Sequence, residues 1–104
     1  MTDDNWHPVA NATDIAPEEP IKVQVGDEEI ALYNIDGDVY ATSNICTHGF
    51  ASMVDGFQEG DAIECPLHGG RFEIKTGKAL CAPVTEELKT FEVKINDGKV
   101  YVKV

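Results

Sequence analysis

Two short boxes, Cys46-Thr47-His48 and Cys65-Pro66-Leu67-His68, each combine one cysteine with one histidine, and a glycine follows each histidine. A zinc finger usually groups its cysteines in one knuckle and its histidines in another. Here each box supplies one thiolate and one imidazole. The pattern therefore predicts a metal site built from two loops, and its candidate ligands are Cys46, His48, Cys65 and His68.

A two-iron [2Fe–2S] cluster suits this donor set, because one iron can take both cysteines and the other both histidines. The glycines after the histidines, Gly49 and Gly69, would let backbone N–H groups approach the bridging sulfides. A mononuclear zinc site with the same ligands stays open, although the interleaved order of the ligands argues against it. A Cys46–Cys65 disulfide with incidental histidines also stays open, although disulfides are rare in cytoplasmic chains. Cysteine–histidine catalysis stays open too, but it does not explain two copies of the pair.

The length of 104 residues predicts a single domain over residues 1–104. The chain has no long apolar run, and its first residues, Met1–Asn5, are acidic and polar, unlike a secretory signal. We therefore expect a cytoplasmic protein. Three cysteines argue against a disulfide framework, because one would be left unpaired. We expect the third, Cys81, to behave as a small buried or half-buried apolar residue.

Charge is unevenly spread along the chain, whose formal net charge is −11. Residues 1–70 hold fourteen acids and one base, whereas residues 71–104 hold five acids and seven bases. Because nucleic-acid binding needs a basic face that releases phosphate counterions, nucleic acid is excluded as a partner. The acidity either maintains solubility or steers the protein toward partners with basic docking faces.

Alternating and β-branched segments predict an all-β protein, an antiparallel sandwich or small barrel. A lobe over about Asn44–Gly70 would be inserted between its strands and carry both boxes. Asn96-Asp97-Gly98 predicts a hairpin, and Thr13–Glu19 predicts one helical turn with Thr13 as N-cap. The expected strands are Ile21–Val25, Glu29–Ile35, Val39–Thr42, Ala62–Cys65, Arg71–Ile74, Phe91–Ile95 and Lys99–Val104.

The two boxes, with their glycines, resemble the cluster-binding boxes of the Rieske family, and Gly77–Val84 resembles the proline loop that covers the cluster there. Over nearly its whole length the chain is similar to the small Rieske-type ferredoxins of bacterial aromatic ring-hydroxylating dioxygenases, such as those of naphthalene and biphenyl breakdown. The resemblance implies a Rieske fold and one [2Fe–2S] cluster on the four candidate ligands. It also implies a monomer that docks transiently with a flavin-dependent reductase and a terminal oxygenase.

Departures from the respiratory Rieske pattern bear on the reduction potential. Ala51 and Leu67 stand where that pattern has an extra cysteine pair, and Gly70 and Phe72 stand where it has a serine and a tyrosine. Those hydroxyls donate hydrogen bonds to sulfur, and each lost donor lowers the potential. We therefore expect a potential near the low end of the Rieske range.

The remaining histidine, His7, is expected to be an ordinary strand residue. A mononuclear iron oxygenase needs two further histidines and a carboxylate, and no glycine-rich loop for flavin or nicotinamide is present. The chain is therefore expected to carry electrons and not to catalyse alone. Ile45, Phe50, Leu67 and Pro83 are candidates for an apolar collar at the docking edge. The alternatives are a small subunit of a larger enzyme, such as assimilatory nitrite reductase, and a zinc-bound β-module.

Overall fold

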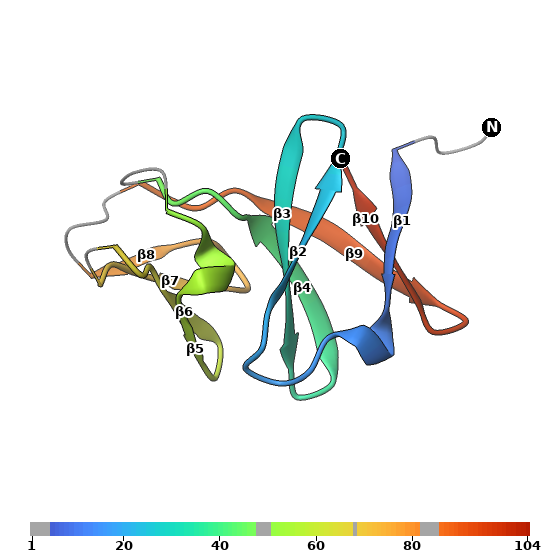
Figure 1. Cartoon of the computed structure of the whole chain (residues 1–104), viewed down its shortest axis with the longest axis horizontal. Coiled ribbons are helices and arrows are strands. Elements are labelled where there is room, and N and C mark those ends of the chain that lie inside the picture. The colour runs from blue at the N-terminus through green and yellow to red at the C-terminus, as the bar shows by residue number, and fades with distance from the viewer. Residues whose placement is uncertain (1–4, 48–50, 68, 82–85) are drawn as a thin grey trace.

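Two antiparallel sheets make up the computed structural model, which describes residues 5–47, 51–67, 69–81 and 86–104. The larger sheet has the strand order β1-β10-β9-β4-β3-β2, and the smaller has the order β5-β6-β7-β8 (Figure 1). Strands of the larger sheet are β1 (Trp6–Asn11), β2 (Ile21–Val25), β3 (Glu28–Ile35), β4 (Asp38–Ser43), β9 (Thr90–Asn96) and β10 (Lys99–Lys103). Strands of the smaller sheet are β5 (Phe57–Glu59), β6 (Ala62–Glu64), β7 (Arg71–Glu73) and β8 (Ala79–Cys81).

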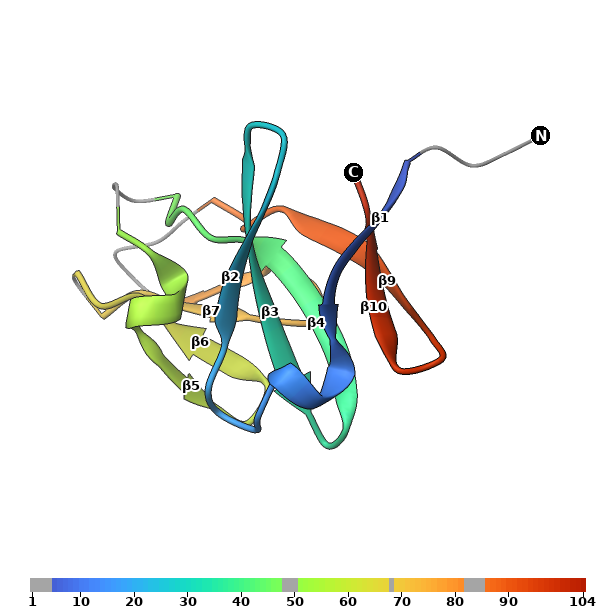
Figure 2. The ribbon, with the colours of Figure 1, turned by 45° about the vertical axis from the view of Figure 1, so that its right-hand side comes forward.

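The two sheets lie side by side along the long axis of the molecule, whose extents are 42 × 26 × 18 Å (Figures 1 and 2). Strands β1 and β2, at the two ends of the larger sheet, approach each other, so that this sheet is a nearly closed barrel. The all-β prediction is therefore confirmed. Among the described residues, no helix has the length and apolarity that a membrane crossing needs.

Strand β3 belongs to both hydrophobic cores. Successive side chains of a strand point to opposite faces. Ile30 and Leu32 therefore face the core inside the barrel, whereas Ala31, Tyr33 and Ile35 face the core between the barrel and the smaller sheet. All five side chains are at most 8% exposed. The strand thus joins the barrel to the part of the chain that carries the two boxes.

Asp-Gly turns close two hairpins of the barrel. In Asp36-Gly37 and in Asp97-Gly98 both residues have positive φ, from 53° to 90°. Two-residue turns with positive φ at both positions match the twist of the flanking strands, and Asp-Gly is a favoured pair there. The predicted hairpin around Asn96–Gly98 is confirmed, with Lys99 paired to Asn96.

Three details differ from the sequence-based expectations. The helical turn is a 3-10 helix, η1 (Ala12–Asp14), which follows Asn11, so the N-cap assignment to Thr13 is wrong. The Asn11 N–H donates to the Asp14 carboxylate at 3.0 Å and holds this turn. Strands β7 and β8 belong to the smaller sheet, so this sheet extends beyond Gly70, the residue at which the inserted lobe was expected to end. Strands β1, β5 and β8 were not predicted, although His7 does lie in β1 as expected.

Candidate metal centre

Both boxes lie in loops that are closed by the same backbone contact. The Cys46 N–H donates to the Ala51 carbonyl at 3.0 Å, and the Cys65 N–H donates to the Gly70 carbonyl at 2.7 Å. Each bond joins a cysteine to the residue five positions later, so each loop contains the histidine of its box. The first loop follows β4 and the second connects β6 to β7. Strand β4 thus leads into the first loop, and strands β6 and β7 hold both ends of the second.

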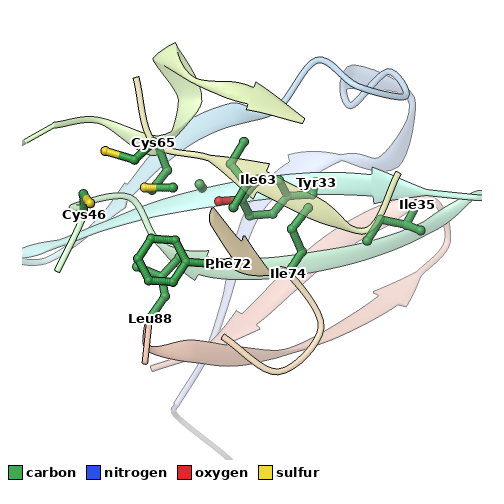
Figure 3. Close-up of a cluster of buried hydrophobic side chains, with 10 residues drawn as sticks. Tyr33, Ile35, Cys46, Ile63, Cys65, Phe72, Ile74 and Leu88 are labelled. Atoms are coloured by element: carbon green, nitrogen blue, oxygen red, sulfur yellow. The ribbon is translucent and has the colours of Figure 1, made fainter. Parts of the chain in front are cut away.

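Cys46 and Cys65 are buried free thiols, 3% and 2% exposed, in the core between the two sheets. Figure 3 shows their sulfur atoms at the same end of this core, opposite Ile35. Burial raises the pKa of the Cys65 thiol above its ordinary value, and the neighbouring Cys46 side chain raises it further. A hydrogen bond from the Leu67 backbone to the Cys65 sulfur acts in the opposite direction. The fold therefore brings together the two predicted cysteines, 19 positions apart in the sequence.

This pair of sulfur atoms fits the iron that takes two thiolates. Soft thiolate ligands suit iron–sulfur clusters, and hydrogen bonds to the sulfurs are among the features that tune them. Because burial disfavours the charged form of the Cys65 thiol, and thiolate is the form that binds metal, metal binding there would release a proton. The imidazole half of the donor set, His48 and His68, lies outside the described residues, so those two assignments stay predictions.

The surroundings of the two thiols match several expectations. Leu67 is 48% exposed, as a residue of a docking rim should be, and Ile45 is half-buried. Phe72 is fully buried in the same core as both cysteines. Gly69 has a φ of +75°, and a Cβ added there would meet nothing within 4 Å. The positive φ favours glycine at this position, and the Gly69 N–H donates to the Cys65 carbonyl at 3.2 Å, so its expected approach to a bridging sulfide stays a prediction. Gly49, Phe50 and Pro83 lie outside the described residues.

The expectation for Cys81 is wrong, because this cysteine is exposed. It ends β8, an edge strand of the smaller sheet, whose neighbour among the described strands is β7. Its Sγ atom lies 3.9 Å from the Gly69 carbonyl, close to the second loop. The three cysteines therefore differ clearly in environment, and only two of them line the core.

Thr47 makes a contact that the sequence did not indicate. Its hydroxyl donates to the Glu86 carbonyl at 3.1 Å, across 39 positions of the sequence. Because any residue has a backbone carbonyl, no residue type at position 86 could have signalled this bond. It joins the first box to the segment that follows the predicted proline loop.

The family comparison agrees with this centre. The model of the Rieske [2Fe–2S] domain matches residues 5–92, which include both boxes, the whole smaller sheet and the larger sheet up to the start of β9. The chain belongs to the Rieske [2Fe–2S] domain family. It therefore carries one Rieske [2Fe–2S] cluster, and the cofactor prediction is confirmed.

Several proteins similar to this Rieske chain are ferredoxins. The chain is 52% identical, over 95% of both chains, to the ferredoxin component of the naphthalene 1,2-dioxygenase/salicylate 5-hydroxylase systems of Ralstonia sp. The structure of the Sphingomonas yanoikuyae B1 ferredoxin has 40% identity and a TM-score of 0.92, with 96% and 99% of the two chains covered. A chain from the complex of reduced oxygenase and oxidized ferredoxin in carbazole 1,9a-dioxygenase has 41% identity and a TM-score of 0.91, with 97% and 94% covered.

Proposed function

We propose that this Rieske protein is a one-electron carrier of an aromatic ring-hydroxylating dioxygenase system. The observation that supports this most directly is the pair of buried free thiols, Cys46 and Cys65, that two separate loops bring together at one end of the core. A relative with 52% identity is a ferredoxin component of such a system. The function is thus electron delivery to an enzyme.

Cys46 and Cys65 would hold one iron of the cluster, and His48 and His68 the other. The cluster supplies a single reversible electron at a potential that the imidazoles raise above that of an all-thiolate cluster. The protein's own residues shield the cysteine side with the core of Phe72 and its neighbours. The second loop leaves Leu67 at the surface, where a partner can approach.

The electron donor would be a flavin-dependent reductase, and the acceptor would be the terminal oxygenase. Support for the acceptor comes from the carbazole 1,9a-dioxygenase complex, whose ferredoxin this fold matches at a TM-score of 0.91. A role as small subunit of an assimilatory nitrite reductase has less support, because the relative with 52% identity is a dioxygenase ferredoxin. Docking would be transient, since a carrier must leave each partner.

The ligand assignment is tested by substituting each cysteine with serine and each histidine with alanine, and by measuring iron, acid-labile sulfide and the paramagnetic spectrum. Loss of Cys46 or Cys65 should remove the cluster, because thiolates hold it. The matched control is Cys81→Ser, an exposed cysteine outside the core, which should keep full iron content. A cluster that survives Cys65→Ser, or one zinc per chain in place of two irons, would contradict the assignment.

The docking edge is tested by Leu67→Asp, which places a charge on the exposed rim of the second loop. Electron transfer to the oxygenase should slow at every salt concentration, while the cluster spectrum stays unchanged. Val104→Asp is the matched control, because Val104 is 42% exposed but directly follows the barrel strand β10. If Leu67→Asp transferred electrons at the full rate to both partners, this rim would not be the docking site.

Added salt should affect the rate at which the ferredoxin associates with a partner more than it affects the complex once formed. The chain has a formal net charge of −11, and surface charges are screened over about 8 Å at physiological salt. If the partner's docking face is basic, added salt should therefore slow electron delivery by the ferredoxin when the ferredoxin is limiting. Salt should have little effect on electron delivery once the ferredoxin saturates the partner.

A further inference from the structure

Asn44 is a fully buried polar side chain, two positions before Cys46. It directly follows β4, at the point where the chain leaves the barrel and enters the first loop. Buried polar groups are costly unless they are hydrogen-bonded. Its contacts therefore indicate what the residue does there.

The backbone of Asn44 starts a short stem that supports the first loop. Its N–H donates to the Glu29 carbonyl at 2.8 Å, and its carbonyl accepts the Met53 N–H at 2.7 Å. One step further, Ile45 and Ser52 form an antiparallel bridge, and beyond them the Cys46 N–H donates to Ala51. The two arms of the loop thus pair from Asn44 up to the cysteine.

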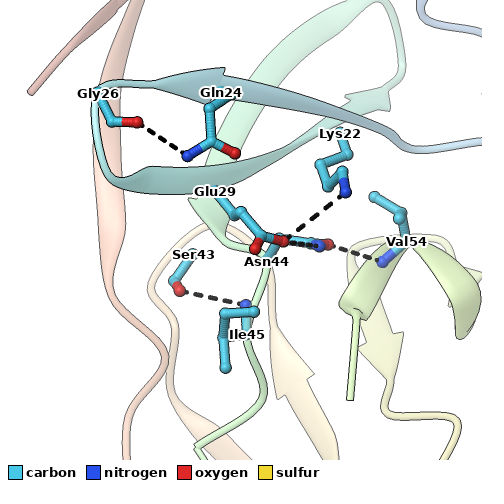
Figure 4. Close-up of polar contacts among 8 residues, drawn as sticks. All are labelled: Lys22, Gln24, Gly26, Glu29, Ser43, Asn44, Ile45 and Val54. Atoms are coloured by element: carbon cyan, nitrogen blue, oxygen red, sulfur yellow. Dashed lines mark hydrogen bonds and ion pairs between the residues drawn. The ribbon is translucent and has the colours of Figure 1, made fainter. Parts of the chain in front are cut away.

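The side chain of Asn44 joins both arms of this stem to the barrel (Figure 4). Its Oδ1 accepts the Val54 N–H at 3.0 Å, and its Nδ2 donates to the Glu29 carboxylate at 3.4 Å. Val54 lies in the 3-10 helix η2 (Met53–Asp55), and the residue before this helix, Ser52, makes no capping bond with its side chain. Helix N-termini leave backbone N–H groups unsatisfied. Asn44 supplies the acceptor that Ser52 does not.

Glu29 is the anchor of this arrangement. It belongs to β3, the strand shared by the two cores, and it binds Asn44 through both its backbone and its side chain. Its carboxylate is also 3.9 Å from the Lys22 ammonium on the neighbouring strand β2. The line of contacts therefore runs from the barrel surface through Glu29 and Asn44 to the stem of the first loop.

We propose that Asn44 is a positioning residue, which fixes the backbone of the first loop, and with it Cys46, relative to strand β3. The proposal rests on the proposed function, because it matters for the cluster only if Cys46 is a ligand. Its effect is on how firmly the cluster is retained. The two side-chain hydrogen bonds have different roles. The bond from Val54 to Oδ1 fixes the arm of the loop that contains the 3-10 helix η2, and the bond from Nδ2 to Glu29 fixes the loop relative to the barrel.

The first test is Asn44→Asp, which keeps an acceptor for Val54 and replaces the donor to Glu29 by a carboxylate that faces a carboxylate. Visible absorbance is followed in the presence of an iron chelator. We expect cluster loss to become about tenfold faster, because replacing a buried hydrogen bond by a repulsive contact costs about as much free energy as a tenfold change in rate requires. Adding Glu29→Gln restores a donor–acceptor pair of inverted polarity, with the same total charge as the unmodified protein. This double variant should lose its cluster at close to the original rate.

Gln58→Glu is the matched control. It makes the same amide-to-carboxylate change at another buried polar side chain, which lies in β5 and donates to the Asn34 and Gly60 carbonyls. Gln58→Glu should lower the stability of the protein toward urea. For the same loss of stability, however, it should speed cluster loss less than Asn44→Asp does. Equal cluster loss in the two variants, or no recovery in the double variant, would overturn the proposal.

A second readout does not depend on the cluster. In the unmodified protein the Val54 amide should be protected from hydrogen exchange, and it should stay protected in Asn44→Asp but not in Asn44→Leu. An equally protected Val54 amide in Asn44→Leu would refute the role of Oδ1. Failure of the ligand assignment itself is seen separately, as retention of the cluster in Cys46→Ser.

Discussion

Gly77 and Gly98 form a natural pair for testing how closely the chain packs beside the metal centre. Their φ angles are nearly equal, +78° and +75°. A Cβ added at Gly98 would meet nothing within 4 Å, whereas one added at Gly77 would collide with the Leu88 carbonyl oxygen and lie 3.2 Å from Thr90 Cγ2. Alanine at either position therefore shares the cost of a positive φ, and only Gly77→Ala adds a backbone collision.

The two costs can be estimated separately. A positive φ costs a non-glycine residue about 1 kcal/mol, so Gly98→Ala should destabilise by about that amount. Relief of the collision at Gly77 requires Leu88 to move, although its N–H donates to the Gly77 carbonyl at 2.7 Å and its side chain is 2% exposed. A lost hydrogen bond and a partly lost leucine contact together add about 2–3 kcal/mol. Gly77→Ala should therefore cost about 3–4 kcal/mol in total.

Urea denaturation under anaerobic conditions measures this difference, with far-ultraviolet circular dichroism for the fold and visible absorbance for the cluster. The variants are compared at equal iron content, because metal binding and folding are coupled. Gly77→Ala should also release its cluster at lower urea than Gly98→Ala, since Leu88 shares a core with Cys46 and Cys65. Equal destabilisation by the two substitutions would refute the close approach of Gly77 to Leu88.

Two further predictions concern protons and potential. Burial raises the pKa of Tyr33, whose hydroxyl is 2.8 Å from Thr42 Oγ1, so the unfolded phenol ionises first. The contribution of Tyr33 to stability is therefore full below about pH 10 and is lost as pH rises above it, and this part of the alkaline fall in urea midpoints should be absent from Tyr33→Phe. Gly70→Ser combined with Phe72→Tyr should raise the midpoint potential of the cluster, because each new hydroxyl would donate a hydrogen bond to sulfur. If each hydrogen bond favours the reduced state by about 1 kcal/mol, each should raise the potential by about 40 mV. An unchanged potential in voltammetry would mean that the new hydroxyls do not reach sulfur.

Strands with clear alternation could be predicted from the sequence, and short edge strands could not. The expected bounds of β2, β4, β9 and β10 agree with the structure to within one residue. Strand β1 contains Pro8, which argues against a strand, but β1 is an edge strand with a bulge between Pro8 and Ala10, where proline is tolerated. Strands β5 and β8 have three residues each, too few to show a period.

The cysteine pair could be identified from spacing, but its environment could not. Box order distinguishes Cys46 and Cys65 from Cys81, because only these two are followed by a histidine at ligand spacing. Exposure does not follow from residue type: a free cysteine is usually buried, yet Cys81, at the end of the edge strand β8, is exposed. Burial depends on which parts of the chain pack against each face of a sheet, and these long-range contacts are contained in no local pattern.

Asn44 shows the same limit for a polar residue. In the sequence it is an asparagine in a predicted loop, and asparagine is common in loops because it bonds to nearby backbone. Its side-chain partners are instead Glu29, 15 positions before it, and Val54, 10 positions after it. Only the folded chain brings these three groups together. Strand β3, which contributes Glu29 to this contact and Tyr33 to the core of the two thiols, therefore connects the barrel with the metal centre by two independent routes. A substitution that loosens β3 should weaken cluster retention even when it touches neither box.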